Sequence, residues 1–435
     1  MNLETRIRST GARLLSSRGF QRLSRNRARL KRRLGGGQPE IHYFHQVDDP
    51  YSHLAVQKLD QLRATYPLAF KVLLCSQPSA DYLGSSEHFD NWALRDAASI
   101  ASGYGLDFPA NPVPPQPDAV RAANDQLAPL LESDSFAGTA KEIGASLWTG
   151  ASSEQLQAVG SKSAEGRTAV ATGNAAREKL GHYAGAMFYF EGEWYWGVDR
   201  LRLLEARLAE ESLAPARTQI CVPEPTPVDT TSLDTGAVLL EYFPSLRSPY
   251  TAIGHNRVLE LIERSGVNVA VRPVMPMLMR GVPAPRAKQR YIISDAAREG
   301  HAHGSPLGRI VDPFGDPVRR AFALFPAAEK LSKGMEFVTA YLQAAWVDGV
   351  DITTEAGLKV VAEQAGLDWQ ALQDAREGTD WEAVLDQNLN EMLSAGLWGV
   401  PSFRVSGGNA SEAFACWGQD RIWRVENEIA ARVTG

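Results

Sequence analysis

The apolar positions of the chain fall into the same order of elements in both halves. In the first half, EIHYFHQ (40–46) and AFKVLLCS (69–76) are short apolar runs typical of buried strands, and residues 50–67 between them have helical spacing. The counterparts in the second half are the run AVLLEYF (237–243), a helical stretch at 249–266 and the run NVAVRPVM (268–275). Each half is therefore predicted to begin with a β-α-β unit.

Beyond the second strand, each half is mainly helical before it returns to strands. In the second half the pattern predicts helices around 284–300, 316–347, 354–365 and 380–395, strands at VPSFRVS (400–406) and FACWG (414–418), and a last helix at 419–433. The order β-α-β, helical block, β-β-α builds a small mixed sheet with helices on both faces. This is the order of a thioredoxin-like domain with a helical insertion in its middle.

Three landmarks recur in the same order and predict an internal duplication. They are YFHQVDDPY (43–51) against YFPSLRSPY (242–250), LWTG (147–150) against AWVDG (345–349), and WGVDRLRLLEARL (196–208) against WGQDRIWRVENEI (417–429). A Pro- and Thr-rich stretch without periodicity, 213–236, separates the copies. We therefore expect an α/β chain with two tandem thioredoxin-like domains, at 38–212 and 237–435.

Composition narrows the class of protein. A chain of 435 residues is expected to hold two or three domains, and 44% apolar residues suffice for a buried core. The only cysteines, Cys75, Cys221 and Cys416, form no CxxC pair, which argues against a disulfide framework, a cysteine-rich zinc site and a dithiol redox centre. No segment has the ~20 apolar residues of a membrane span. A reducing compartment, the cytoplasm, is the simplest setting.

The charge of the chain is uneven. Residues 1–37 hold eleven Arg or Lys and one acid, Glu4, for a net charge of +10, whereas the rest carries −16 of the total −6. This segment reads as a mobile basic arm, with a transit peptide and a helix that contacts anionic membrane weakly as the alternatives. A specific nucleic-acid partner is not expected, because the acidic body would repel phosphate.

The second half, over about 238–433, resembles the DsbA-like family that holds 2-hydroxychromene-2-carboxylate isomerase and the kappa-class glutathione transferases. The segments that carry the resemblance are SPY (248–250), RPVMP (272–276), PRAKQRYIISDAAREGHAHGSP (285–306), AGLWGVPSFRV (395–405) and WGQDR (417–421). The first half resembles the same family more faintly. The resemblance implies a glutathione-dependent enzyme with glutathione as its cofactor.

Ser248 stands where the first strand of the second domain meets the first helix, followed by Pro249 and Tyr250. The unpaired N–H groups and the dipole of a helix N-terminus favour negative charge. DsbA-like relatives place a cysteine at this position. A serine cannot act as the redox sulfur, but it can donate a hydrogen bond to the thiolate of bound glutathione. The alternative is that Ser248 serves only as a helix cap.

Two further motifs imply contacts to glutathione. In the family, the proline of GVP (399–401) is cis, so the backbone of Val400 beside Pro401 would pair with the ligand as an added strand. Gln419 and Asp420 would hold the γ-glutamyl end, the Asp420 carboxylate taking its ammonium group. An ordinary loop proline and a simple helix cap at Asp420 are the alternatives.

A fourth group lies on one predicted helix. Lys288, Tyr291, Asp295 and Arg298 are spaced by three or four residues and so share one face. The resemblance turns this face toward the active cleft, where Lys288 or Arg298 would meet a substrate carboxylate and Tyr291 would line the site. A solvated charged face is the alternative.

The first half departs from the family at the corresponding positions. Asp49 replaces the serine and would repel a thiolate, GAM (185–187) replaces the proline motif, and only Asp199 of the WGVDR segment is kept. We expect a degenerate domain with a structural role, packed against the second domain like the partner in a dimer. A cluster of His and Asp side chains within residues 42–53 invites a metal, but His42 and His45 face opposite sides of a strand, so we expect no metal. The pair His301 and His303 is no stronger a metal candidate.

Two classes of function follow. The first is a glutathione-dependent isomerase or transferase acting on an unsaturated or aromatic small-molecule substrate, with Ser248 as the catalytic residue. The second is a binding or chaperone-like protein that kept the scaffold and lost the chemistry. A thiol-disulfide oxidoreductase relative acting through Cys416 ranks last, because an isolated cysteine in a strand is usually an inert apolar side chain.

Overall fold

The chain forms two compact units in this computed structural model, which describes residues 3–84, 86–156, 163–216 and 218–434. We call the first domain Leu23–Pro225 with Ala284–Tyr291, and the second domain Met1–Arg22, Thr226–Pro283 and Ile292–Gly435. The units differ from the predicted domains in three segments, one of which is the predicted linker 213–236, divided between the units after Pro225. The start of the chain, expected as a separate arm, is shared between the units, and residues 284–291 belong to the first domain.

The sheet of the first domain contains four strands, β1 (Glu40–His45), β2 (Ala69–Leu74), β3 (Met187–Phe190) and β4 (Glu193–Trp196). Their order is β2-β1-β3-β4. Strand β1 is parallel to β2 and antiparallel to β3, which in turn is antiparallel to β4.

The sheet of the second domain repeats this arrangement. Its strands are β5 (Val238–Phe243), β6 (Asn268–Val271), β7 (Ser402–Gly407) and β8 (Phe414–Trp417), in the order β6-β5-β7-β8. Strand β5 is parallel to β6 and antiparallel to β7, and β7 is antiparallel to β8. The predicted fold class, α/β with two thioredoxin-like domains, is confirmed.

The helices of the first domain include a block inserted between β2 and β3. They are α3 (Pro50–Val56), α4 (Leu59–Thr65), α5 (Ala80–Leu83), α6 (Ser86–Ala101), α7 (Pro117–Leu127), α8 (Phe136–Trp148), α9 (Ser153–Leu156), α10 (Ser163–Lys179) and α11 (Gly197–Glu210). The single helix predicted over 50–67 is in fact two. Gln57 lies at the break and exchanges hydrogen bonds with the backbone of Asp107, which fixes the turn.

The helices of the second domain include the insertion expected between β6 and β7. They are α1 (Leu3–Ser16), α12 (Pro249–Ser265), α14 (Asp316–Lys330), α15 (Gly334–Trp346), α16 (Glu355–Gln364), α17 (Trp369–Arg376), α18 (Trp381–Ser394) and α19 (Ile422–Thr434). Helices α2 (Arg18–Leu34) and α13 (Arg286–Ala302) contribute residues to both units. The helix predicted over 316–347 is two, broken where Ser332 adopts a φ of 58°, and α17 was not predicted.

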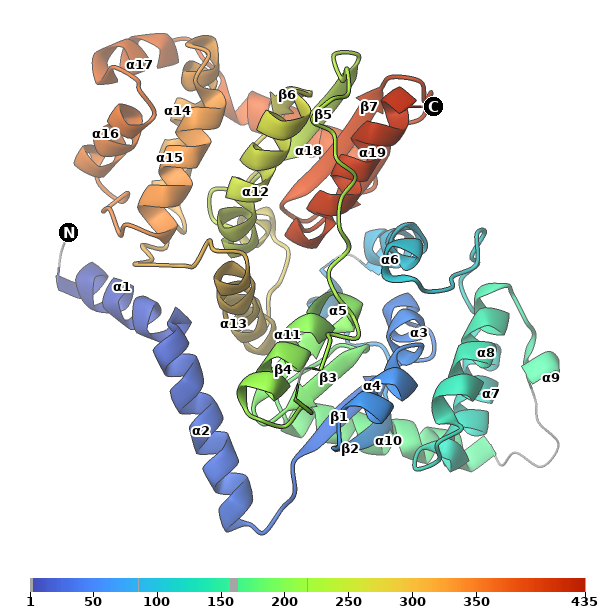
Figure 1. The fold of residues 1–435 in the computed structure, drawn as a ribbon. Helices are drawn as coiled ribbons and strands as arrows, with labels where there is room; N and C mark the ends of the chain where they lie inside the picture. The colour runs from blue at the N-terminus through green and yellow to red at the C-terminus, as the bar shows by residue number, and fades with distance from the viewer. Residues whose placement is uncertain (1–2, 85, 157–162, 217, 435) are drawn as a thin grey trace. The chain divides into compact units, whose positions relative to one another are not determined.

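The core of the second domain lies between its sheet and the pair α12 and α19 (Figure 1). Leu240 and Tyr242 from β5, Phe403 from β7, Leu261 from α12 and Val425 from α19 are buried together there. Burying an apolar side chain of this size contributes about 1.5–3 kcal/mol. The core therefore fixes the start of α12 against the ends of β5 and β7, where the candidate site lies.

The basic segment at the start of the chain is helical, and one face of α2 pairs with the first domain. In the first domain, Arg25 of α2 pairs with Glu193 at 3.0 Å and Arg29 with Glu211 at 2.7 Å. Arg32 pairs with Glu191. Because one face of the helix meets a row of carboxylates, part of the excess positive charge is neutralised within the protein.

Arg207 of α11 binds two of these carboxylates from the interior of the first domain. Its side chain is fully buried and donates hydrogen bonds to the carbonyl of Phe190 at 2.7 Å, to Glu211 at 2.9 Å and to Glu193 at 3.3 Å. The same two glutamates accept from Arg25 and Arg29. The acidic row is therefore held between a buried arginine and the basic face of α2.

We expect Arg207→Ala to lower the free energy of unfolding of the first domain by about 3–5 kcal/mol, because it leaves buried carboxylates without their partner. Urea unfolding followed by circular dichroism measures the change. Arg121→Ala, at an exposed position of α7, is the matched control and should cost little. A loss below about 1 kcal/mol in Arg207→Ala, as for a surface pair, would contradict this assignment.

Candidate functional site

Ser248 occupies the end of the segment that follows β5 and caps α12. Its Oγ accepts a hydrogen bond from the N–H of Thr251 at 3.1 Å, and Pro249 occupies the first turn of the helix. The hydroxyl donates to the carbonyl of Val400 at 3.5 Å, the outer limit for such a bond. Ser248 keeps 7% of its surface exposed. The residue is thus a helix cap, and its hydroxyl proton is only weakly engaged.

The loop before β7 brings the predicted proline motif to Ser248. The Val400–Pro401 peptide bond is cis. The N–H of Val400 has no hydrogen-bond partner in the part of the chain that the structure describes. Gly399 is required here, because a Cβ at this position would lie 2.1 Å from the ring of Trp417. The loop therefore presents one free backbone donor beside the Ser248 hydroxyl.

Gln419 and Asp420 belong to a 3-10 turn, η4 (Gln419–Arg421), that precedes α19. Gln419 is buried and donates to Glu299 at 2.8 Å and to Asp420, while its Oε1 has no partner in the described structure. The carbonyl of Gln419 accepts from Arg257 of α12 at 3.1 Å. Asp420 is half-buried. The turn thus offers a buried acceptor and a carboxylate next to α12.

The separation of these groups along α12 can be estimated from the helix. Gln419 packs against Gly254, where an added Cβ would lie 2.8 Å from the Gln419 Cβ. Gly254 follows Ser248 by six residues, which at the helical rise is about 9 Å along the axis. An extended tripeptide spans about 10 Å. The hydroxyl of Ser248 and the turn at Gln419 therefore lie within the length of one extended tripeptide.

Helix α13 contains all four residues predicted to share a face, and they are divided between the two units. Arg298 donates to Asp295 at 3.0 Å, and Asp295 also accepts from Tyr250 at 2.9 Å. Both Arg298 and Asp295 are buried, so they link α12 to α13 inside the second domain.

Lys288 and Tyr291 pack within the first domain instead. Lys288 donates to the carbonyl of Tyr82 at 2.8 Å, and burial lowers its pKa to about 8. The ring of Tyr291 contacts that of His182 edge-on, at 4.9 Å between centroids. Lys288 and Tyr291 therefore belong to the first domain, whereas Ser248 belongs to the second.

Sequence reasoning missed four side chains that frame the site. Thr251 and Ser245 are fully buried, and the Thr251 hydroxyl accepts from the Ser245 N–H at 3.4 Å. Glu299 receives the Gln419 amide. Arg280 donates to the carbonyl of Trp398 at 2.7 Å, which fixes the loop before Pro401. Nothing in the sequence pattern around Thr251 or Arg280 marks these roles.

Asp49 holds in the first domain the position that Ser248 holds in the second. It caps α3, accepting from the N–H groups of Tyr51 at 3.2 Å and Ser52 at 3.0 Å and from the Ser52 hydroxyl at 2.8 Å. Burial raises the pKa of Asp49 to about 7, although the hydrogen bonds from Ser52 and Tyr51 act in the opposite direction. The group is therefore close to half protonated at neutral pH, which moderates the repulsion expected from a carboxylate.

The loop that corresponds to the proline motif is closed in the first domain. Ala186, at φ 53°, donates its N–H to the Ser52 hydroxyl at 2.8 Å, a bond that Pro401 cannot make. A Cβ at Gly185 would lie 2.7 Å from the side chain of Gln46 and 3.2 Å from Asp49. The space beside the cap is therefore filled by the protein's own side chains.

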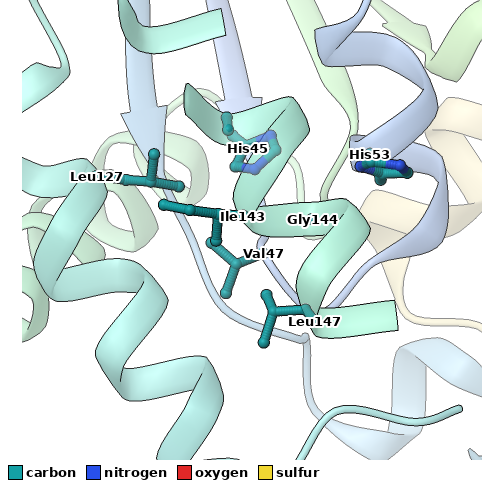
Figure 2. A pocket seen from close by; sticks show the side chains of 8 residues that line it. His45, Val47, His53, Leu127, Ile143, Gly144 and Leu147 are labelled. Atoms are coloured by element: carbon teal, nitrogen blue, oxygen red, sulfur yellow. The ribbon is translucent and has the colours of Figure 1, made fainter. Parts of the chain in front are cut away.

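A narrow cavity lies near this position and contains two histidines (Figure 2). His45 and His53 line it with apolar side chains from α7 and α8, and it has no room for the centre of a water molecule. Burial lowers the pKa of His45 to about 3 and of His53 to about 4, so both rings are neutral. Over the described residues, no group of three or more His, Cys, Asp or Glu side chains is placed to hold a metal ion.

Cys75 and Cys221 belong to the first domain, and Cys416 belongs to strand β8 of the second. Cys75 and Cys416 are buried, Cys221 is partly exposed, and none is bonded to another. Burial raises the pKa of Cys75 to about 12, which makes it a poor nucleophile.

Several contacts recur in both domains at the same sequence separation. Tyr51 donates to Asp96 and Tyr250 donates to Asp295, each across 45 residues. The N–H of Gln46 donates to the Ser52 hydroxyl, as that of Ser245 donates to Thr251. These contacts near the cap are common to both domains. The domains differ at the cap residue itself and in the loop beside it.

Comparison with known proteins identifies the second domain. Residues 239–430 match the family model of the DSBA-like thioredoxin domain. No curated protein sequence matches this chain.

Similar solved structures include 2-hydroxychromene-2-carboxylate isomerase, at 20% identity over 44% of this chain and 95% of that one, with a TM-score of 0.37. The cytosolic disulfide reductase DsbM of Pseudomonas aeruginosa is 20% identical over 45% of this chain and 100% of its own, with a TM-score of 0.37. A structure of DsbM with GSH is 19% identical over 45% of this chain and 99% of its own, with a TM-score of 0.34.

We expect the raised pKa of Asp49 to appear in the pH dependence of stability. A folded-state pKa of about 7 lies above the ordinary value of 3.8, so the contribution of Asp49 is complete below about pH 4 and is lost as the pH rises through 7. Asp49→Asn keeps a capping side chain without this loss. As the pH rises from 4 to 7, the free energy of unfolding of the variant should therefore increase relative to that of the natural protein, by up to about 4 kcal/mol.

Urea unfolding at a series of pH values measures this difference. The neutral buried histidines have lowered pKa values and act with the opposite sign below pH 6.5, but they are common to both proteins and cancel. Asp60→Asn, at an exposed position of α4, controls for the loss of a charge. If the stability difference between Asp49→Asn and the natural protein does not vary with pH, the pKa of Asp49 is not raised and the assignment is wrong.

Proposed function

We propose that this chain, which carries a DsbA-like thioredoxin domain at residues 239–430, is a glutathione-dependent isomerase or transferase with its reaction centre at Ser248. The observation that carries the proposal is the weak engagement of the Ser248 hydroxyl. Its proton points at a carbonyl 3.5 Å away, beside the N-terminus of α12, in a domain whose relatives keep a sulfur at this position. Turning that proton toward an incoming sulfur costs little.

Three groups fit glutathione. The N–H of Val400 has no partner among the described residues, and we propose that it bonds the cysteinyl carbonyl of an extended peptide. Gln419 has a buried acceptor without a partner, about 9 Å along α12. Asp420 provides a carboxylate for the ammonium group of the γ-glutamyl end. Pro249 and Tyr250 form the start of the first turn of α12, next to the proposed ligand.

Bound glutathione supplies a nucleophilic sulfur that adds to an electrophilic carbon of an unsaturated or aromatic substrate and either leaves after rotation or stays. Ser248 donates a hydrogen bond to the sulfur anion, and the first-turn N–H groups of α12 add their partial positive charge. Tyr250, Asp295 and Arg298 act as positioning residues, because their buried network fixes α13 against α12. Both outcomes of the reaction remain within the proposal.

We assign the first domain a structural role and derive it from an internal duplication. The repeated strand order and the contacts repeated at equal separation support a common origin. The side chains of Gln46 and Asp49 approach Gly185 beside the cap, which supports a structural rather than a binding role for this corner. We place the protein in the cytoplasm, consistent with three cysteines that form no disulfide.

We expect Ser248→Ala to lower glutathione-dependent turnover about ten- to a hundredfold, since a hydrogen bond to a charged group contributes about 1.5–3 kcal/mol. Assays against aromatic ring-cleavage products and electrophilic aromatic compounds measure it. Thr354→Ala removes a comparable cap from α16, where Thr354 accepts from Gly357 at 3.1 Å, and should keep full turnover. Ser248→Thr, which retains a hydroxyl, should keep most of it. Full activity of Ser248→Ala would refute the assigned role.

We also expect the pKa of the glutathione thiol to fall on binding, from its ordinary value of about 8.5, because the site favours the anion. Ultraviolet absorbance of the thiolate, titrated against pH with saturating glutathione, reports this value directly. In Ser248→Ala the titration should move back toward that of free glutathione. Absence of glutathione binding by calorimetry would instead favour a binding or chaperone-like protein built on the same scaffold.

A further inference from the structure

Helix α2 exposes an apolar stripe on the side opposite its ion pairs. Leu23, Leu30 and Leu34 are 66%, 57% and 81% exposed, and at 3.6 residues per turn they lie within about 40° of one another. Arg25, Arg29 and Arg32, which pair with glutamates of the first domain, lie about 120–180° away from the stripe. The helix is therefore fastened by its basic face and presents its leucines to solvent.

Unpaired positive charges accompany the leucines. Arg27 lies about 20° and Lys31 about 60° round the helix from the edge of the stripe at Leu34. Both side chains are exposed without an ion pair or hydrogen bond in the described structure. Arg22 and Arg33, also exposed, flank the helix further round. Phe20, at the start of the same helix, is 42% exposed. The surface thus combines apolar side chains with positive charge that the protein does not neutralise.

We propose that this face of α2 docks the protein on an anionic lipid surface. Leucines would enter the boundary between head groups and acyl chains, while Arg27 and Lys31 meet lipid phosphates and carboxylates. No helix in the described residues is long and apolar enough to cross a membrane, so α2 would lie in the plane of the surface. The acids nearest the helix are occupied by Arg25, Arg29 and Arg207, and more distant ones are screened at physiological salt.

Two other occupants fit the surface less well. In a symmetric contact between two copies, the same positive side chains would face one another, which opposes association. Nucleic acid would satisfy the positive charge, but its phosphate backbone would leave the leucines exposed. An anionic bilayer satisfies both the charge and the apolar stripe.

The test uses the full chain and two kinds of vesicle, phosphatidylcholine alone and phosphatidylcholine with phosphatidylserine. We expect co-sedimentation with the anionic vesicles, weakened by added salt. Arg27→Gln with Lys31→Gln should lower the partition coefficient about thirtyfold at low salt, since each basic residue contributes about 1 kcal/mol near such a surface. Arg121→Gln with Lys179→Gln removes the same charge from exposed sites of α7 and α10 and should change little.

Leu23→Ser with Leu30→Ser and Leu34→Ser should abolish binding. Leu30→Cys labelled with a polarity-sensitive dye, in a Cys221→Ser background, gives a second readout that does not depend on the folding of the serine variant. The dye should shift to an apolar signal with anionic vesicles only, whereas the same label at Arg121→Cys should not. Equal binding to both vesicles, no binding, or a dimer that the serine variant dissociates would each overturn the proposal.

Discussion

The first turn of the first helix in each domain begins with backbone N–H groups that the helix itself cannot satisfy, and much of the structure depends on what meets them. In the second domain the Ser248 hydroxyl meets one of them and keeps its own proton weakly bound. In the first domain Asp49 meets two of them and also takes the Ser52 hydroxyl. One cap is a neutral hydroxyl, whereas the other is a carboxyl group, whose pKa is raised because it is buried.

The loop that crosses beside the cap follows the same division. Pro401 has no N–H, so it cannot donate to the side chain at the third position of the helix, and the N–H of Val400 has no partner in the described structure. Ala186 does donate to Ser52, and Gly185 lets Gln46 and Asp49 approach. Two domains with one strand order thus differ at the same corner, where the loop keeps an N–H without a partner among the described residues in one and donates to Ser52 in the other. This difference is why we assign chemistry to one and support to the other.

The basic start of the chain shows how the charge of one helix can serve two purposes. Arg25, Arg29 and Arg32 are used inside the protein, against carboxylates that Arg207 holds from the other side. The positive charge that is not paired within the protein lies on Arg27 and Lys31, near three exposed leucines. This is the charge that can act on a partner. The net charge of the segment alone does not distinguish these roles, since both sets are arginine and lysine.

The sequence by itself determined the strands, the order of elements and the cap at Ser248, because these follow from local periodicity and from residue types at strand ends. It also marked the loop at Val400 and Pro401, through a recognisable motif. Tertiary structure decided what lies far apart in the chain: that Lys288 contacts Tyr82, that Gln419 packs against Gly254, and that α2 is bound through glutamates more than 150 residues away. Such pairings depend on burial and on which side chains meet across a fold, and neither leaves a period in the sequence.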